Sequence, residues 1–237
     1  MPDRRIHRGP HPQDFELFAP AVLPRLREAA CDLSWLLSRG YATASAVKLV
    51  GDRYDLTVRQ RMAIGRSACS DADLVNRDAR RIGPERLAGH ALWIDGYNVL
   101  TTVEAALSGG VLLAARDLAL RDMASMHGSY RKVTETRPAL DLAARTLAEF
   151  EVDCCRWFLD RPVSNSGRLK ALIEELVARG HWPWKVELVQ NPDRVLIESG
   201  EVVASADSLI LDHCRAWFNL GREIVQRRVP DAWIIEL

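Results

Sequence analysis

The spacing of apolar residues separates the chain into two parts with different periodicities. In the first part, Leu26, Ala30, Leu33 and Leu37 recur at helical spacing between Pro24 and Ser38. Such a stripe is typical of an amphipathic helix that buries one face. No alternating strand pattern interrupts this part before residue 83, so we expect residues 14–82 to form helices only.

Start and stop signals place the helices that follow. Ser45 to Tyr54 is predicted to form one helix, Thr57 is a side-chain cap for the next, and Ser70 can begin another. Glycine and proline then interrupt the pattern at positions 83, 84 and 89. We therefore predict a flexible N-terminus over residues 1–13, a helical domain over 14–89 and a second domain over 90–237.

From His90 onward, short apolar runs alternate with amphipathic segments. Helical spacing fits Pro138 to Phe150 and Ser166 to Gly180. The runs predicted as strands are Ala91–Ile94, Val111–Ala115, Ala119–Met123, Arg156–Leu159, Lys185–Val189, Val202–Ser205 and Trp233–Leu237. Strands that alternate with helices predict an α/β domain with a parallel, doubly wound sheet, preceded by the all-α segment.

Composition excludes several classes of protein. Of the 237 residues, 48% are hydrophobic and 27% are charged, which fits a globular protein and not a disordered chain. The longest apolar run, Val111–Ala115, is too short to cross a bilayer, and the N-terminus has no apolar core of a secretory signal. The five cysteines show no CxxC spacing, so neither a disulfide framework nor a zinc ribbon is predicted. We expect a cytoplasmic protein without a membrane partner, and the sequence leaves a homo-oligomer open.

Three predicted strands run directly into an aspartate: ALWID ends at Asp95, RWFLD at Asp160 and VVASAD at Asp207. The carboxyl ends of parallel strands lie on one edge of the sheet, where ligands of such folds bind. We expect these three carboxylates close enough to share one or two Mg²⁺ or Mn²⁺ ions, because converging negative charges need a cation. The alternative for each residue alone is a turn or helix cap.

The first of these strands leads into WIDGYNVL, which contains Asp95, Gly96 and Asn98. This motif resembles the opening of the NYN branch of PIN-like nucleases. The resemblance implies a parallel α/β sheet, a divalent-metal site at its carboxyl edge and hydrolysis of RNA. It implies that Asp95 is a metal ligand and that Asn98 supports the site. Gly96 would let backbone approach a ligand closely.

The resemblance continues through the rest of the chain. FLD at Asp160 is similar to the second acidic strand of the family, and Asp193 corresponds to an acid that begins a helix, with Asp212 as its alternative. Asp207 corresponds to the last acid, where the family usually reads Thr-Ser-Asp and this chain reads Ser-Ala-Asp. The helical segment and GDRY at Gly51–Tyr54 also resemble an uncharacterised prokaryotic family with a PIN-like C-terminal half.

Two segments are candidates for substrate contact. Ser164, Asn165 and Ser166 precede a predicted helix, where they can either receive a phosphate or cap the helix. A second segment mixes Asp122, His127 and Tyr130 with cations, and it can track a phosphate backbone or form a solvated loop. Its candidate phosphate contacts are Arg121, Arg131 and Lys132.

The helical part also resembles a helix-turn-helix around Thr57, with Arg59 and Arg61 early in its second helix. A small helical bundle without DNA contact is the alternative.

The function predicted from these residues is metal-dependent phosphodiester hydrolysis, with RNA as the nucleic-acid partner. Asp95, Asp160, Asp193 and Asp207 would hold the Mg²⁺ or Mn²⁺ ion, with catalytic roles for Asp95, Asn98, Asp160 and Asp207. A nucleic-acid-binding or regulatory module without catalysis is the second hypothesis. A metal-dependent phosphatase for a small substrate is the third.

Overall fold

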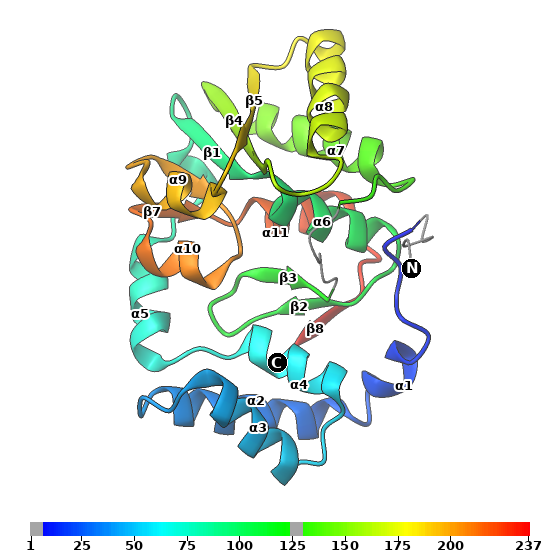
Figure 1. Ribbon diagram of the computed structural model, residues 1–237, viewed down its shortest axis with the longest axis vertical. Helices are drawn as coiled ribbons and strands as arrows, with labels where there is room; N and C mark the ends of the chain where they lie inside the picture. The colour runs from blue at the N-terminus through cyan, green and yellow to red at the C-terminus, as the bar shows by residue number, and fades with distance from the viewer. Residues whose placement is uncertain (1–6, 124–129) are drawn as a thin grey trace.

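Helices make up the N-terminal segment of the computed structural model, which describes residues 7–123 and 130–237 (Figure 1). They are α1 (Asp14–Leu17), α2 (Leu23–Leu37), α3 (Thr43–Arg53), α4 (Val58–Ser67) and α5 (Asp71–Arg80). Thr57 and Ser70 begin α4 and α5 with capping boxes completed by Gln60 and Asp73. Both caps are confirmed, and the all-helical prediction for residues 14–82 holds as far as Arg80, whereas Arg81 forms an isolated parallel β-bridge with Trp217.

A five-stranded parallel sheet forms the centre of the second part. It consists of β1 (Ala91–Asp95), β4 (Cys154–Asp160), β5 (Trp184–Val189), β6 (Val202–Ala204) and β7 (Ala216–Phe218), in the order β5-β4-β1-β6-β7. The 3-10 turn η1 (Pro84–Arg86) leads into β1. Because β1 lies in the middle, the chain first builds the β4 side and later returns to build the β6 side. The switch between the two sides falls beside β1.

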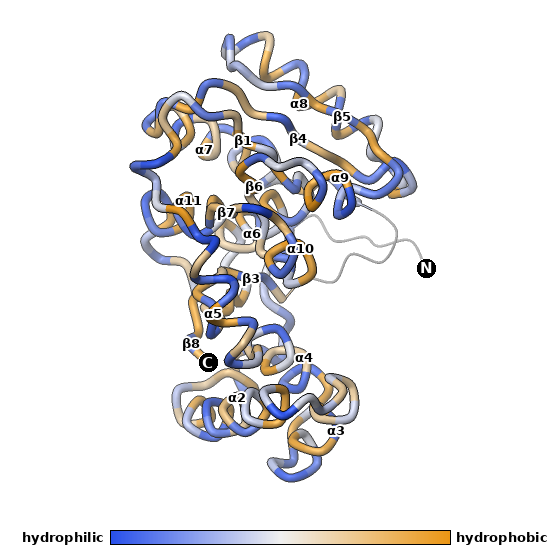
Figure 2. The backbone as a smooth tube through the Cα atoms, turned by 90° about the vertical axis from the view of Figure 1, so that its left-hand side faces the viewer, coloured by the Kyte–Doolittle hydropathy of each residue, from blue (hydrophilic) through white to orange (hydrophobic). Residues whose placement is uncertain are grey.

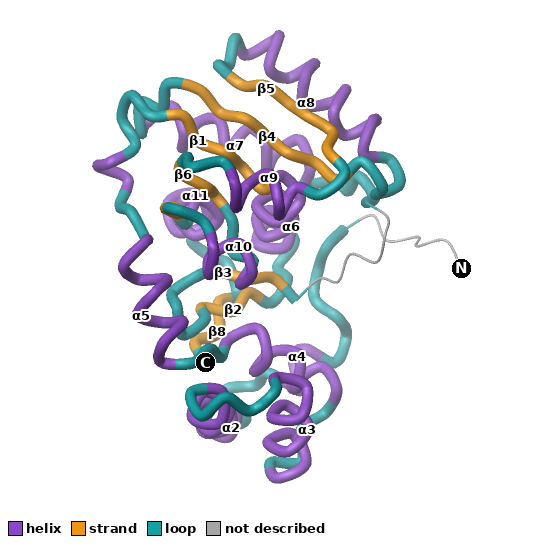
Figure 3. The backbone as a smooth tube through the Cα atoms, turned by 60° about the vertical axis from the view of Figure 1, so that its left-hand side comes forward, coloured by secondary structure: helices purple, strands orange, loops and turns teal. Residues whose placement is uncertain are grey.

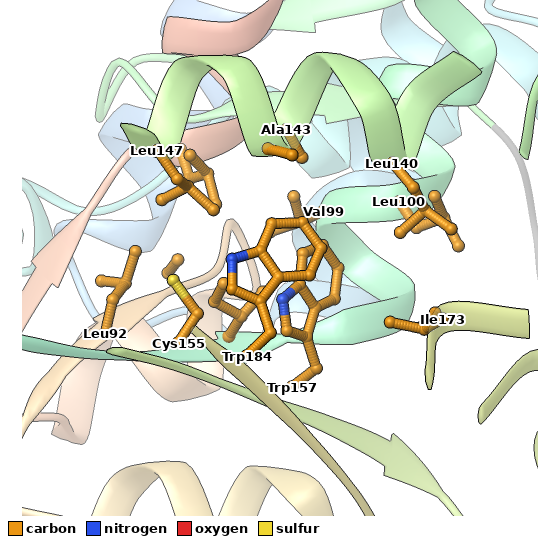
Figure 4. Packing of buried hydrophobic residues seen from close by; sticks show 14 of the residues in the cluster. Leu92, Val99, Leu100, Leu140, Ala143, Leu147, Cys155, Trp157, Ile173 and Trp184 are labelled. Carbon is orange, nitrogen blue, oxygen red and sulfur yellow. The ribbon is translucent and has the colours of Figure 1, made fainter. Parts of the chain in front are cut away.

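Helices cover both faces of this sheet (Figure 3). On one face lie α6 (Gly96–Leu107), α7 (Thr136–Glu149), α8 (Ser166–Gly180) and α11 (Leu220–Arg228), and on the other lie α9 (Pro192–Glu198) and α10 (Ser208–His213). Neighbouring strand residues alternate between the two cores, since Trp157 packs under α7 and Phe158 packs towards α9. The rings of Trp157 and Trp184 contact each other at a tilt of 36° in the core beneath Ala143 and Leu147 (Figure 4).

Three of the predicted strands form a separate small sheet. β2 (Leu112–Ala114) pairs antiparallel with β3 (Leu120–Asp122) and parallel with β8 (Ile234–Glu236). One face of this sheet packs against α2, α3 and α4, and the other packs against α6 and α11. The small sheet therefore joins the helical segment to the α/β part, as Figure 2 shows from the side.

The apolar pattern does not reveal α6, β7 or α11. Nearly every residue of α6 is buried, including Thr101, Thr102 and Glu104, so it carries no polar face to give a helical period. None of the helices in the described ranges is long and apolar enough to cross a bilayer.

Residues 1–6 of the predicted flexible N-terminus lie outside the described residues. From His7 the chain makes specific contacts: the His7 ring nitrogen lies 2.6 Å from a Glu135 carboxylate oxygen, and Arg8 pairs with the fully buried Glu104. Residues 7–8 are thus held against α6 and the start of α7.

Candidate active site

The strand order brings the predicted acids to one edge of the parallel sheet. Asp95 and Asp160 are the last residues of the neighbouring strands β1 and β4. Asp207 caps α10 just after β6, the neighbour of β1 on its other side. Asp193 lies in the first turn of α9, which follows β5. The edge is the one from which α6, α9 and α10 begin (Figure 3).

These four carboxylates share an uncompensated negative field. Burial, followed by the charges of Asp207 and Asp193, raises the pKa of Asp95 to about 7 against the opposing hydrogen bond from Ser205. Burial and the charge of Asp193 raise the pKa of Asp160. Burial and the charge of Asp207 raise the pKa of Asp193. The pKa of each of these three acids is thus raised in part by the charge of at least one other acid, as expected for like charges near one edge.

Short hydrogen bonds fix the geometry between β1 and the loop after β6. The Ser205 hydroxyl donates to Asp95 Oδ2 at 2.8 Å and accepts the Asp207 backbone N–H at 3.0 Å. The Asn98 Oδ1 accepts the Ala206 backbone N–H at 2.8 Å. The hydroxyl of Ser205, two residues before Asp207, therefore holds the acids at the ends of the two strands in a fixed relation. Asn98 faces the same space, as expected.

The acids do not form the tight group that the sequence led us to expect. Among residues 7–123 and 130–237, no three His, Cys, Asp or Glu side chains are grouped so as to hold one ion. The physical reason is local: Asp95 also accepts the Asn98 N–H at 3.5 Å, and Asp207 accepts the Leu209 N–H at 2.8 Å, so both are turned towards helix starts. Repulsion adds to the separation. The donor set nevertheless fits Mg²⁺, which keeps several waters and needs one or two direct carboxylates.

A pocket of about 420 Å³ opens beside Asp95 and Asp207. It lies where the helical segment, the small sheet and the parallel sheet meet. Its lining residues are Gly65, Arg66, Asp95, Tyr97, Asn98, Thr101, Thr102, Arg121, Asp122, Ala206, Asp207 and Ser208. Asp160 and Asp193 do not line it, so the acidic edge extends beyond the pocket.

Sequence reasoning did not place several of these lining residues at the acidic site. Asp122 is buried and accepts hydrogen bonds from the hydroxyls of Thr101 at 3.1 Å and Thr102 at 3.3 Å. The Tyr97 hydroxyl is buried and has no hydrogen-bond partner among the described residues, and burial and the charge of Asp160 raise the pKa of Tyr97. Tyr97 had a signal in the sequence, because it stands inside the DGYN motif. Asp122 and Arg66 reach the site only through long-range packing.

Gly96 has a packing role that the sequence analysis did not predict. A Cβ at this position would lie 2.6 Å from a Leu159 methyl and 2.9 Å from the Phe158 carbonyl oxygen. These atoms belong to the neighbouring strand β4, so α6 approaches β4 closely at this residue. Glycine is required here by helix–strand packing.

Arg121 and Asp212 belong to a buried ion network, which corrects their predicted roles. Arg121 donates to Asp117 at 2.6 and 2.9 Å and to the Ala206 carbonyl at 2.7 Å. Arg77 of α5 bonds Asp117 at 2.6 Å and both Asp212 oxygens at 2.6 and 2.9 Å. Arg121 lines the pocket with a guanidinium already engaged, and Asp212 faces α5 and not the sheet edge. The network instead anchors the loop that carries Asp207.

The predicted phosphate-binding segment before α8 also lies at the carboxyl edge, since it follows β4. Asn165 begins α8 in a left-handed conformation with φ 70° and makes no side-chain cap, so capping does not explain it. Its amide donates to the Tyr130 carbonyl at 3.1 Å, and the Ser166 hydroxyl donates to the Arg161 carbonyl at 3.3 Å. Ser164, Arg131 and Lys132 are exposed, and their phosphate role stays a prediction. His127 lies outside the described residues.

The arginines of the helix-turn-helix-like segment are held in intramolecular ion pairs. Arg59 forms a bidentate ion pair with the fully buried Asp14, whose Oδ2 lies 2.7 Å from Arg59 Nη2. Arg61 bonds Asp52 at 2.8 Å and the Leu56 carbonyl at 2.8 Å. These contacts tie the helices of the segment together, as the helical-bundle alternative expects, and DNA contact by this segment stays a prediction.

The fold and the acidic site define the class of this protein. It is an α/β protein with a helical N-terminal segment and with acidic residues at the carboxyl edge of a parallel sheet, beside the switch point. Residues 84–223 match the family described as "Domain of unknown function (DUF5616)", and the chain belongs to this family. Residues 25–80 match the family described as "Protein of unknown function (DUF434)".

A relative of the chain is "Uncharacterized protein MJ0935" of Methanocaldococcus jannaschii. The two are 30% identical over 188 residues, which cover 78% of this chain and 88% of the relative. No solved structure matches the chain.

Proposed function

We propose that this protein hydrolyses phosphodiester bonds of single-stranded RNA with Mg²⁺ or Mn²⁺ at the acidic carboxyl edge. One observation carries the proposal: Asp95 is buried at the switch point beside two further acids, and its pKa is raised to about 7. Buried carboxylates that repel one another need protons or a cation for compensation. A PIN-like identity for the sheet is part of the same proposal, supported by the DGYN motif at the end of β1.

The residues divide into three tasks. Asp95 and Asp207 would hold one ion on the pocket side, and Asp160 and Asp193 would hold a second on the β4 side, each ion keeping several waters. Asn98 and Ser205 keep the β1 and β6 ends in register through their bonds to Ala206 and Asp95. When bound, the ion would lower the pKa of a water and stabilise the negative charge that develops on the phosphate.

Proton transfer falls to the acids with raised pKa values. Asp160 is half-buried at this edge, so the carboxylate oxygen of Asp160 that does not contact the ion can take the proton from the attacking water. The water oxygen then bonds to phosphorus while the bond to the leaving ribose oxygen breaks. The leaving oxygen must gain a proton, which solvent can supply at this open edge.

The size of the pocket favours a second candidate function. A volume of about 420 Å³ is that of a small-ligand site and holds roughly one nucleotide, too little for a duplex. A metal-dependent phosphatase that acts on a small phosphorylated substrate has the same requirements. The binding-module hypothesis loses only the support of the helix-turn-helix-like segment, since Arg59 and Arg61 form intramolecular ion pairs.

Single-turnover cleavage of a labelled single-stranded RNA in Mn²⁺ tests the proposal. Asp95→Asn keeps the shape but removes one ligand charge, so we expect the cleavage rate to fall by a factor on the order of 100 or more. Asp141→Asn, exposed on α7, is the matched control and should cleave like wild type. Equal activity of Asp95→Asn and wild type rejects the mechanism. Hydrolysis of p-nitrophenyl phosphate without RNA cleavage selects the phosphatase.

A further inference from the structure

The loop between β4 and α8 is fixed at the acidic edge by hydrogen bonds. Asp160 ends β4, and Arg161 follows it directly. The Arg161 backbone N–H donates to the carbonyl of Val189, at the end of β5, at 2.8 Å. The Ser166 hydroxyl donates to the Arg161 carbonyl at 3.3 Å. The backbone at Arg161 is therefore held next to the last residue of β4, between the end of β5 and the start of α8.

The segment that leads into α7 is attached to the same loop. The Tyr130 N–H donates to the Ser164 carbonyl at 3.2 Å, and the Asn165 amide donates to the Tyr130 carbonyl at 3.1 Å. Arg131 and Lys132 follow Tyr130 directly. The fold therefore joins two segments that lie far apart in sequence, and both of them carry cations.

Four exposed cations of these two segments form what we call the basic patch: Arg131, Lys132, Arg161 and Arg168. Within residues 7–123 and 130–237, none of their side chains forms an ion pair with a carboxylate. The Arg161 guanidinium donates to the Leu188 carbonyl at 3.1 Å, which leaves its charge without a counterion. No acidic residue occurs in the stretches YRKVT and RPVSNSGRLK that contain the patch. The fold therefore leaves the positive charge of the patch uncompensated, directly beside the acidic edge.

Stability of the fold does not account for these cations. Other exposed arginines of the α/β part have acidic partners, as Arg137 has in Glu175 and Arg194 has in Glu198. Arg168 lies in the first turn of α8, a turn that contains no acid. A cation at the start of a helix opposes the helix dipole, so its position there favours an anion from outside the chain.

We infer, on the basis of the proposed function, that the basic patch binds phosphates of the single-stranded RNA on the β4 side of the acidic edge. Arg161 and Arg168 thereby position the strand, together with Arg131 and Lys132. Exposed guanidinium and ammonium groups bind phosphate oxygens without reading the bases, so the contact is independent of sequence.

The position of the patch also separates a strand from a small substrate. None of its four cations lines the pocket of about 420 Å³ beside Asp95 and Asp207. A substrate confined to the pocket would not contact the patch. A strand whose scissile phosphate lies at the acidic edge extends beyond the pocket, and its next phosphates can reach Arg161.

A solvated surface without a ligand is the alternative reading of the four cations. Salt dependence separates the two, because each phosphate contact releases counterions and adds a fixed increment to the slope of log Kd against log salt. Cations that contact no phosphate add no such increment.

The test measures fluorescence anisotropy of a short labelled single-stranded RNA bound to the full chain over a range of salt concentrations. EDTA is present, so that no strand is cleaved by a metal-dependent reaction. For the double variant Arg161→Gln/Arg168→Gln we expect about tenfold weaker binding at low salt and a slope that is shallower by about 1.4. Arg161→Lys/Arg168→Lys keeps both charges and should keep the slope.

Arg215→Gln is the matched control. Arg215 is exposed and donates to the Gly200 carbonyl at 3.3 Å, much as Arg161 donates to the Leu188 carbonyl. It directly precedes β7, at the opposite edge of the parallel sheet, so its variant should bind RNA with the wild-type slope. Circular dichroism checks the folding of each variant.

The outcomes decide the inference separately from the proposed function. An unchanged slope for the folded double variant, or an equal loss of slope in Arg215→Gln, overturns the inference even where wild type cleaves RNA. A wild type that binds RNA with the expected slopes but cleaves none in Mg²⁺ or Mn²⁺ supports the basic patch and rejects the nuclease. A wild type that binds no RNA overturns the inference, and hydrolysis of p-nitrophenyl phosphate by that protein then selects the phosphatase.

Discussion

Asp95 and Asp117 are both buried aspartates, yet their surroundings differ in one respect. Asp117 bonds Arg77 and Arg121, whereas Asp95 receives one hydroxyl bond from Ser205 and faces further acids. Burial raises the pKa of Asp117, but the two guanidiniums outweigh it and hold the pKa below its usual range. The pKa of Asp95 is raised to about 7. The network of Asp117 with Arg77 and Arg121 is balanced in charge and stabilises the fold. The acidic edge around Asp95 carries excess negative charge and is suited to bind a cation.

The largest expected effect comes from breaking the balanced network. Asp117→Asn leaves Arg77 and Arg121 buried with one carboxylate fewer, so we expect a loss of about 3 kcal/mol or more in the free energy of unfolding. Urea unfolding at neutral pH with EDTA measures it. Asp141→Asn on the surface of α7 is the control and should change the free energy by less than about 0.5 kcal/mol. A loss for Asp117→Asn as small as that of the control would contradict the assignment.

An Asp→Asn substitution at Asp95, on the acidic edge, should raise the free energy of unfolding at neutral to alkaline pH and not lower it. The folded-state pKa of Asp95 lies above the unfolded value of 3.8, so its stabilising contribution is present below about pH 4 and is lost as pH rises through about 7. Metal-free Asp95→Asn should therefore lose less stability than wild type between pH 5 and pH 8, and gain on the order of 1 kcal/mol at pH 8. Urea titrations at both pH values measure the difference. If the unfolding free energies of wild type and Asp95→Asn change with pH in the same way, the pKa of Asp95 is not raised in the folded protein.

The convergence of the acids was predictable because a regular rule governs it. Apolar strands that end in Asp95 and Asp160 place both carboxylates on one edge whenever the strands are parallel. The caps at Thr57 and Ser70 follow equally local rules. Local signals therefore predicted α2 to α5, α7 and α8, four of the five strands of the parallel sheet, and the edge that carries the acids.

The remainder depends on contacts between distant parts of the chain. Arg66 and Asp122 are 56 residues apart in sequence and meet only because the small sheet packs against α4. Arg121 looks like a phosphate contact in sequence, and only the fold shows Asp117 and Ala206 at its donors. Apolar periodicity also cannot show that β2, β3 and β8 form a sheet of their own. The unpredicted part of the site is thus the wall that contains Arg66 and Asp122, and not the acids of the parallel-sheet edge.

Calorimetric titration of the metal-free protein with Mn²⁺ tests the central claim most directly. The account predicts saturable binding at neutral pH, with proton release because Asp95 must ionise, and much weaker binding by Asp95→Asn. Asp117→Asn, if folded, should retain the binding, since its carboxylate belongs to the ion network. Absence of Mn²⁺ binding by wild type, or equal binding by Asp95→Asn, would contradict the claim that the acidic edge holds a divalent cation.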